Sequence, residues 1–61
     1  GMITALVSGG PWDGRYLTLR DDTDVVVIPD DIGGDNHQCP VRRMLATGRD
    51  GTVATAIIDW R

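Results

Sequence analysis

Residues 2–20 read MITALVSGGPWDGRYLTLR, and this stretch decides the fold. Its first part alternates so that Ile3, Ala5 and Val7 share one face of a strand, and its last part alternates again with both leucines on one face. Between them, residues 9–14 contain three glycines, a proline and an aspartate, which is a strong signal for chain reversal. The pattern predicts two strands joined by a tight turn.

Two further strands follow from similar patterns. Residues 25–28 are β-branched at every position until Pro29 removes the next backbone donor, so we expect a strand that is apolar on both faces. Residues 48–51, Gly-Arg-Asp-Gly, form a good hairpin loop. After that loop, an alternation of apolar residues predicts the last strand: Ala54, Ala56, Ile58 and Trp60.

The segment 41–47 fits two structures. Val41, Met44 and Leu45 would share one face of a short helix that begins after Pro40. As a strand, the segment supplies the partner that the last strand needs and closes an antiparallel hairpin, and we favour this interpretation. The predicted fold is therefore all-β, with about five antiparallel strands in a meander that forms a small SH3-like barrel or a strongly twisted sheet. A short helix at 41–47 would make the class α+β instead.

The length allows one small domain. With 61 residues the chain holds a single core, which we assign to residues 2–61 because Gly1 resembles the residue left by cleavage of an affinity tag. A domain of this size buries only about 60% of the surface that its unfolded chain exposes. We therefore expect a homo-oligomer, in which contact between copies adds the apolar area that the core lacks.

Charge and apolar runs disfavour several classes of partner. Nine acidic residues against six arginines give a net charge of −3, which disfavours binding to the phosphate backbone of nucleic acids. The longest apolar run, 25–29, is far shorter than the ~20 residues that cross a bilayer, and no leader opens the chain, so we expect a cytoplasmic protein without a membrane partner. The single cysteine, Cys39, excludes an internal disulfide and suits a reducing compartment.

The string Gly9-Gly10-Pro11-Trp12-Asp13-Gly14 is the most specific in the chain. It resembles the Gly-Gly-Pro-x-Asp-Gly turn that many small proteins of actinobacterial phages and prophages carry between two short strands. The resemblance covers the first third of the chain. It implies a phage or prophage origin, with a location in the host cytoplasm or in the phage particle, and no particular activity.

Trp12 and Trp60 are the candidate interaction residues. A large aromatic side chain at a turn either folds back over one end of a barrel or stands exposed as a binding anchor, and the small core favours the first role for Trp12. The turn 9–14 and Trp60 together form the predicted interaction surface. We therefore expect a protein-interaction or assembly module, which binds a protein partner through a sheet edge or a tryptophan-bearing surface.

Residues 29–40 are expected to form a long loop, and loops of this length are often functional. Within it, Asp35, His37 and Cys39 would lie on one side of an extended backbone, and they carry donor atoms that zinc accepts. Structural zinc sites usually need four such ligands, and the chain has one cysteine and one histidine. A metal-binding module is therefore an alternative function.

Five aspartates surround the predicted strand 25–28: Asp21, Asp22, Asp24, Asp30 and Asp31. They suit solvated turns, and they are the sole basis for a further alternative, an acidic mimic of nucleic acid. For catalysis, Ser8 or Cys39 with His37 would supply a nucleophile and a base, but no spacing in the sequence shows them held together. We expect no enzyme and no cofactor.

Overall fold

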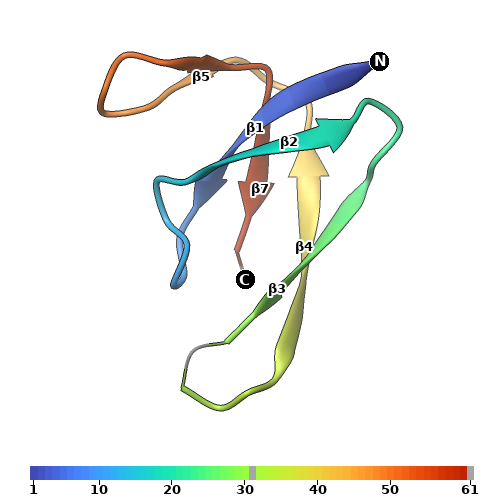
Figure 1. Cartoon of the computed structure of the whole chain (residues 1–61), viewed down its shortest axis with the longest axis vertical. Coiled ribbons are helices and arrows are strands. Elements are labelled where there is room, and N and C mark those ends of the chain that lie inside the picture. The colour runs from blue at the N-terminus through green and yellow to red at the C-terminus, as the bar shows by residue number, and fades with distance from the viewer. Residues whose placement is uncertain (31, 61) are drawn as a thin grey trace.

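The computed structural model describes residues 1–30 and 32–60, and over those residues it contains strands and turns only. Five strands form one curled sheet in the order β2-β1-β7-β4-β3, and two short strands form a separate hairpin (Figure 1). The strands are β1 (Met2–Ser8), β2 (Tyr16–Arg20), β3 (Val25–Pro29), β4 (Asn36–Arg42), β5 (Ala46–Thr47), β6 (Val53–Ala54) and β7 (Ala56–Asp59). The predicted all-β class is confirmed. Within the described ranges, no helix is long and apolar enough to cross a membrane.

The first hairpin forms as its alternation predicts. β1 pairs antiparallel with β2, and Ala5 lies opposite Leu17. Ala5 and Val7 are buried, and Leu17 and Leu19 pack half-buried against the same core. The period of two in the sequence therefore fixes which face of both strands points inward.

The order of the strands differs from a meander at the centre of the sheet. β7 lies parallel to β1, with Ala5 beside Ala56 and Val7 beside Ile58, so the sheet is mixed. All four of these residues are buried, and the central position gives both strands a neighbour on each side. As a consequence, β2 and β3, which follow one another in the chain, become the two edges of the sheet.

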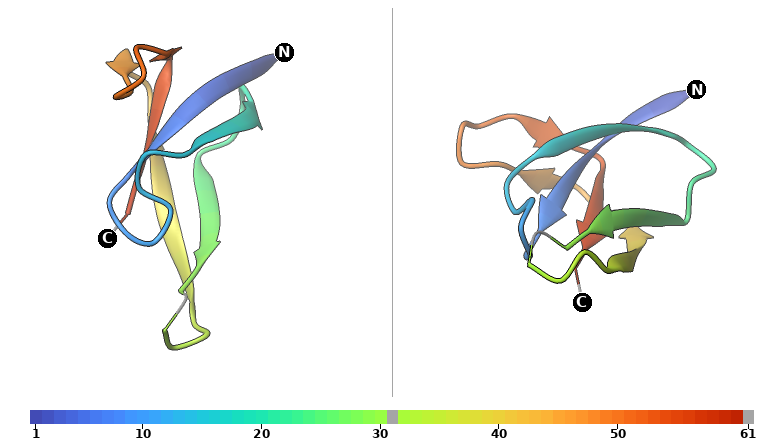
Figure 2. Two further views of the ribbon diagram at one scale, coloured as in Figure 1. Left: turned by 60° about the vertical axis from the view of Figure 1, so that its left-hand side comes forward. Right: turned by 60° about the horizontal axis from the view of Figure 1, so that its bottom comes forward.

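β2 and β3 diverge from the turn at residues 21–24 instead of pairing with each other. The Arg43 guanidinium donates to the main-chain oxygens of Asp21 and Thr23, the second at 2.9 Å. These bonds tie the turn to the segment that follows β4. The sheet consequently curls into a half-barrel with β2 and β3 along its open sides (Figure 2).

The loop predicted over residues 29–40 is mostly strand, and this expectation is wrong. β4 begins at Asn36 and pairs antiparallel with the whole of β3, so the connection between the two strands is short. Polar residues concealed the strand in the sequence, because Asn36 and Gln38 occupy its exposed positions while Cys39 is buried on the other face. The hairpin extends beyond the end of β7 (Figure 1).

Pro40 limits how far β4 pairs with β7. The Val41 N–H points toward β3, where it donates to the Asp24 oxygen at 2.8 Å, so the neighbouring position of β4 has to supply the donor toward β7. Pro40 has no N–H, and β4 pairs with β7 only at Val41 and Arg42. The first part of β4 is thereby left with β3 as its strand partner.

The helix considered for residues 41–47 is wrong, and the favoured hairpin is confirmed in outline. Val41 pairs with Ile58 in the main sheet, and Ala46 pairs with Ala54 in the β5-β6 hairpin. The two pairings differ in register by one residue. The chain therefore follows one hairpin, but its strand pairing is interrupted at residues 43–45.

The core is small and lies on the inner face of the half-barrel. Its buried cluster consists of Ala5, Val7, Ile28, Cys39, Ala56 and Ile58. Half-buried residues pack around that cluster, among them Leu17, Leu19, Val26, Trp12 and Trp60. Because two of the six buried residues are alanine, the large side chains at the margin contribute much of the apolar contact.

Candidate interaction surface

The turn between β1 and β2 contains a β-bulge and is stabilised by the side chain of Asp13. Gly14 N–H donates to the Val7 oxygen at 2.8 Å, and Val7 N–H donates to the Arg15 oxygen at 2.8 Å, so two residues of one strand oppose one residue of the other. Gly14 has a φ of +87°, which such a bulge requires. Gly9 N–H donates to Asp13 Oδ1 at 2.6 Å, as expected for an aspartate that stabilises a turn.

Trp12 folds back against the core rather than standing free. It is half-buried and packs against the buried cluster, and the Arg15 guanidinium carbon lies 5.3 Å from the centre of its ring. Its neighbour Pro11 is exposed. The geometry fits the covering role for Trp12, with a cation–π contact on the indole.

Trp60 is held in a stack of groups from three parts of the chain. The main-chain N–H of Trp60 donates to the main-chain oxygen of Ser8 at 3.0 Å. The centroids of the Trp60 and His37 rings lie 4.1 Å apart, at an interplanar angle of 33°. Gly10 lies against the indole so closely that a Cβ there would be 2.3 Å from Trp60 Cδ2. The stack joins the 9–14 turn, β4 and the end of β7.

His37 continues this stack toward the 30–35 turn. His37 Nε2 lies 3.3 Å from Asp30 Oδ2. The Ile32 N–H donates to Asp30 at 2.8 Å, and this bond, followed by that of His37, holds the pKa of the Asp30 carboxyl below its ordinary value. Asp30 therefore remains a carboxylate through the neutral range and anchors both the turn and the imidazole.

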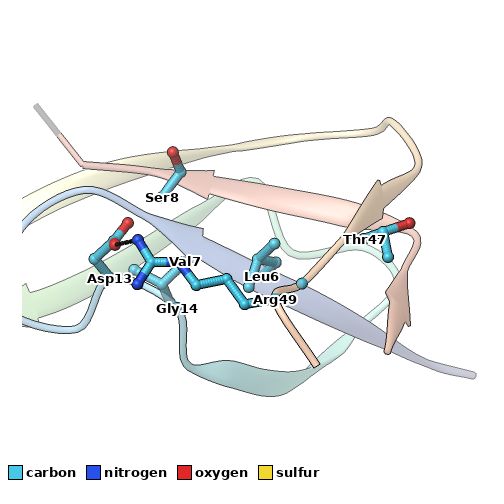
Figure 3. A pocket seen from close by; sticks show the side chains of 8 residues that line it. Leu6, Val7, Ser8, Asp13, Gly14, Thr47 and Arg49 are labelled. Atoms are coloured by element: carbon cyan, nitrogen blue, oxygen red, sulfur yellow. Dashed lines mark ion pairs between the residues drawn. The ribbon is translucent and has the colours of Figure 1, made fainter. Parts of the chain in front are cut away.

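A shallow cleft lies between the 9–14 turn and the β5-β6 hairpin (Figure 3). Its volume is about 200 Å³, and an ion pair between Arg49 and Asp13, with Nη2 and Oδ2 3.9 Å apart, crosses it. A second depression of about 230 Å³ is lined by Gly14, Tyr16, Arg49 and Asp50. Both are smaller than most ligand pockets, which measure about 300–1,000 Å³.

A contact between Tyr16 and the β5-β6 loop was not foreseen from the sequence. The Tyr16 hydroxyl donates to Asp50 Oδ1 at 2.7 Å and lies directly over Gly48, where no Cβ could fit. Its bond to Asp50 raises the pKa of Tyr16, and donors from Thr52 and Tyr16 lower the pKa of Asp50. The loop thus contacts the side chain at the start of β2. No local pattern in the sequence signals this contact, because its two partners lie far apart in the chain.

The structure does not bring the three metal candidates together. Cys39 is buried in the core, with its Sγ 3.7 Å from the main-chain oxygen of His37, whereas Asp35 is exposed. Among the residues that the structure describes, no three histidine, cysteine, aspartate or glutamate side chains are placed to hold one metal ion. His37 and Cys39 lie on one strand face as predicted, but Cys39 serves as a core residue.

The aspartates near β3 are distributed over its two ends. Asp21 lies 3.2 Å from the N-terminal amine, and Asp22 lies 3.5 Å from Arg20 Nε. Asp24 is exposed at the start of β3, and Asp30 follows its end. Asp31 lies outside the described residues. These positions give β3 an acidic residue at each end.

The outer edge of β3 carries two exposed apolar residues, Val25 and Val27. Asp30 N–H donates to the Asp35 oxygen on the β4 side, so the alternate residues Val25 and Val27 direct their main-chain N–H and C=O groups away from β4. Their side chains are 51% and 53% exposed, respectively. This edge therefore offers backbone hydrogen bonds and apolar contacts at the same two residues.

No protein-family model, no curated protein and no solved structure matches this chain.

Proposed function

We propose that this chain is a non-catalytic protein-interaction module that binds its partner at the β3 edge. The observation that supports the proposal is the outward backbone of Val25 and Val27 together with their half-exposed side chains. An extended segment of another protein can add to such an edge as a further strand, with main-chain bonds giving affinity and side chains giving specificity. Natural sheets usually protect exposed apolar edges, so an unprotected one suggests a binding function.

The resemblance of the Gly9–Gly14 turn supports a phage or prophage accessory role for this module, in the host cytoplasm or the phage particle. In this role the turn supports the fold, because its glycines leave room for the Trp60 side chain and Trp12 packs against the core. The gene neighbourhood tests the assignment, since adjacent capsid, tail or replication genes would support it and a purely metabolic neighbourhood would contradict it.

Self-association through this edge meets an electrostatic obstacle. In an antiparallel pair of β3 strands related by a two-fold axis at Val27, Asp24 of one copy lies opposite Asp30 of the other. Like charges directly opposite each other destabilise a strand pair. We therefore propose that a homo-oligomer of this kind forms only at salt concentrations that screen the aspartates.

The proposal is tested by capture with a matched pair of variants. Val27→Lys places a charge on the outer edge, and Val53→Lys introduces the same change at a valine of similar exposure, 58%, on β6. Each protein is immobilised and exposed to a lysate of the native host. The wild-type protein and the Val53→Lys variant are expected to retain the same partner, and the Val27→Lys variant is expected not to retain it. The identified partner is then purified and the binding repeated. Equal retention by both variants would refute a role for the β3 edge.

A further inference from the structure

The chemistry of the strand that binds the β3 edge follows from the charges around it. This inference rests on the proposed function, and it concerns the kind of segment that the edge selects. The two edges of the sheet differ in the charge of their outward residues and in the groups at their ends. These differences indicate the kind of strand that binds.

The β2 edge carries polar and charged groups at its two ends. The 48–52 loop meets Tyr16 at the start of β2, where the Tyr16 hydroxyl bonds to Asp50 at 2.7 Å. At the other end, Arg20 is exposed and ion-paired with Asp22. A charged residue on an edge strand is one of the devices by which proteins prevent strand addition. The β2 edge is thereby less suited to a partner strand.

Val25 and Val27, the residues of β3 that direct their main-chain groups outward, carry no charge. Val25 and Val27 supply two donors and two acceptors toward the open side, and Pro29 ends the row because it has no N–H. A partner strand therefore gains main-chain bonds over a short segment only. Such a short ladder needs additional contacts at its ends to give useful affinity.

The groups at the ends of this ladder are mainly acidic. Asp24 is exposed at the start, and Asp30 and Asp35 flank the end. Arg42 and Arg43 also lie near the start, but Arg42 is ion-paired with Asp59 at 3.8 Å, and the Arg43 guanidinium is directed at main-chain oxygens of the preceding turn. His37, beside Asp30, is the basic group near the other end. The net surplus of negative charge favours a partner with positive charge at both ends of its strand.

We infer that the β3 edge binds an extended segment of another protein in which alternating β-branched residues are flanked by arginine or lysine. The β-branched side chains lie beside Val25 and Val27, and the basic groups lie near Asp24 and Asp30. A second copy of this chain brings aspartates to the same places, so it is the less favourable occupant.

Two synthetic peptides test the inference. One alternates valine and threonine and has arginine at both ends, and the other differs only in having glutamate at both ends. Each is titrated into the ¹⁵N-labelled protein and followed by its amide NMR signals. We expect the arginine peptide to shift the amides of Val25 and Val27 and to bind about tenfold more tightly than the glutamate peptide at low salt, since each exposed ion pair contributes little and two attractions become two repulsions. The difference is expected to shrink as salt is added.

Variants of the protein make the test specific. Val27→Lys is expected to abolish the shifts and Val53→Lys to leave them unchanged, while Asp24→Asn reduces the preference for the arginine peptide. The inference is overturned if neither peptide shifts these amides, if both bind alike, or if raising the concentration of the protein alone moves the same signals, which would make a second copy the occupant. If Val27→Lys loses the captured partner while the two peptides bind alike, the proposed function stands and the inference about charge fails.

Discussion

Substitution of Gly10 by alanine should destabilise the protein through Trp60. Gly10 has a φ of +70°, and a Cβ at this position would lie 2.3 Å from Trp60 Cδ2 and 2.5 Å from Cγ. Gly34 provides a matched control, because its φ is +73° and a Cβ there would have nothing within 4 Å. The two substitutions therefore share the backbone cost and differ only in the displacement of the indole.

The magnitudes follow from these two contributions. An alanine in the left-handed region costs about 1 kcal/mol, which both variants bear. Removing a large aromatic side chain from a core costs about 3–5 kcal/mol, so displacing the half-buried Trp60 should cost about 2 kcal/mol. We expect a loss of about 3 kcal/mol for Gly10→Ala and about 1 kcal/mol for Gly34→Ala. A domain of this length has a total stability of about 3–9 kcal/mol, so Gly10→Ala should lose at least about a third of it.

Urea unfolding measures the difference. Tryptophan fluorescence and far-UV circular dichroism follow the transition, and at a slope of about 1 kcal/mol per molar urea the midpoints of the two variants should differ by about 2 M. The near-UV circular dichroism of Gly10→Ala should also weaken, because the ring contact between Trp60 and His37 is lost. Equal midpoints for the two variants would show that Trp60 does not pack on Gly10 as described.

Three further results are expected. Tyr16→Phe should be less stable than wild type mainly at pH values between the ordinary titration ranges of aspartate and tyrosine. The lowered pKa of Asp50 gives stability that is lost as the pH falls through its folded value, and the raised pKa of Tyr16 gives stability that is lost as the pH rises above about 10. A difference in urea midpoint between the two proteins that does not change with pH would contradict the bond. The thiol of Cys39, which is fully buried, should react with a disulfide reagent only as fast as the protein opens, and immediate labelling of the folded protein would refute its burial. Light scattering at low salt should give a mass of 6.6 kDa, with any larger species increasing as salt is added, and a dimer that dissociates with salt would exclude our electrostatic argument.

The strands with one clean alternating face were predictable from the sequence. β1, β2 and β7 direct every second residue toward the core, and these inward residues, such as Val7, Leu17 and Ile58, were identified correctly because a period of two admits only one such face. β4 was missed because its exposed positions carry Asn36 and Gln38 and because Pro40 argued against a strand. Only its pairing with β3, a contact that no local pattern encodes, makes it one.

The parallel pairing of β1 with β7 was also beyond local reasoning. Both strands were predicted, but alternation does not say which strand lies beside which, and neighbours in sequence are the usual first choice. The contacts of the candidate surface have the same origin. Tyr16 meets Asp50 and Trp60 meets Gly10 only after the sheet has brought distant segments together. The turn residues themselves, including Asp13 on Gly9, were accessible because their bonds are local.

The central place of β7 has a consequence for how the chain folds. The β1-β2 and β3-β4 hairpins are each closed by short turns and can form within microseconds, but in the five-stranded sheet they meet only through β7. β7 joins β1 across about fifty residues of sequence, so its insertion carries most of the loop-closure entropy. The rate-limiting step of folding should therefore be the insertion of β7 between the two preformed hairpins. Substitutions in β7 should slow refolding more than substitutions at either hairpin turn.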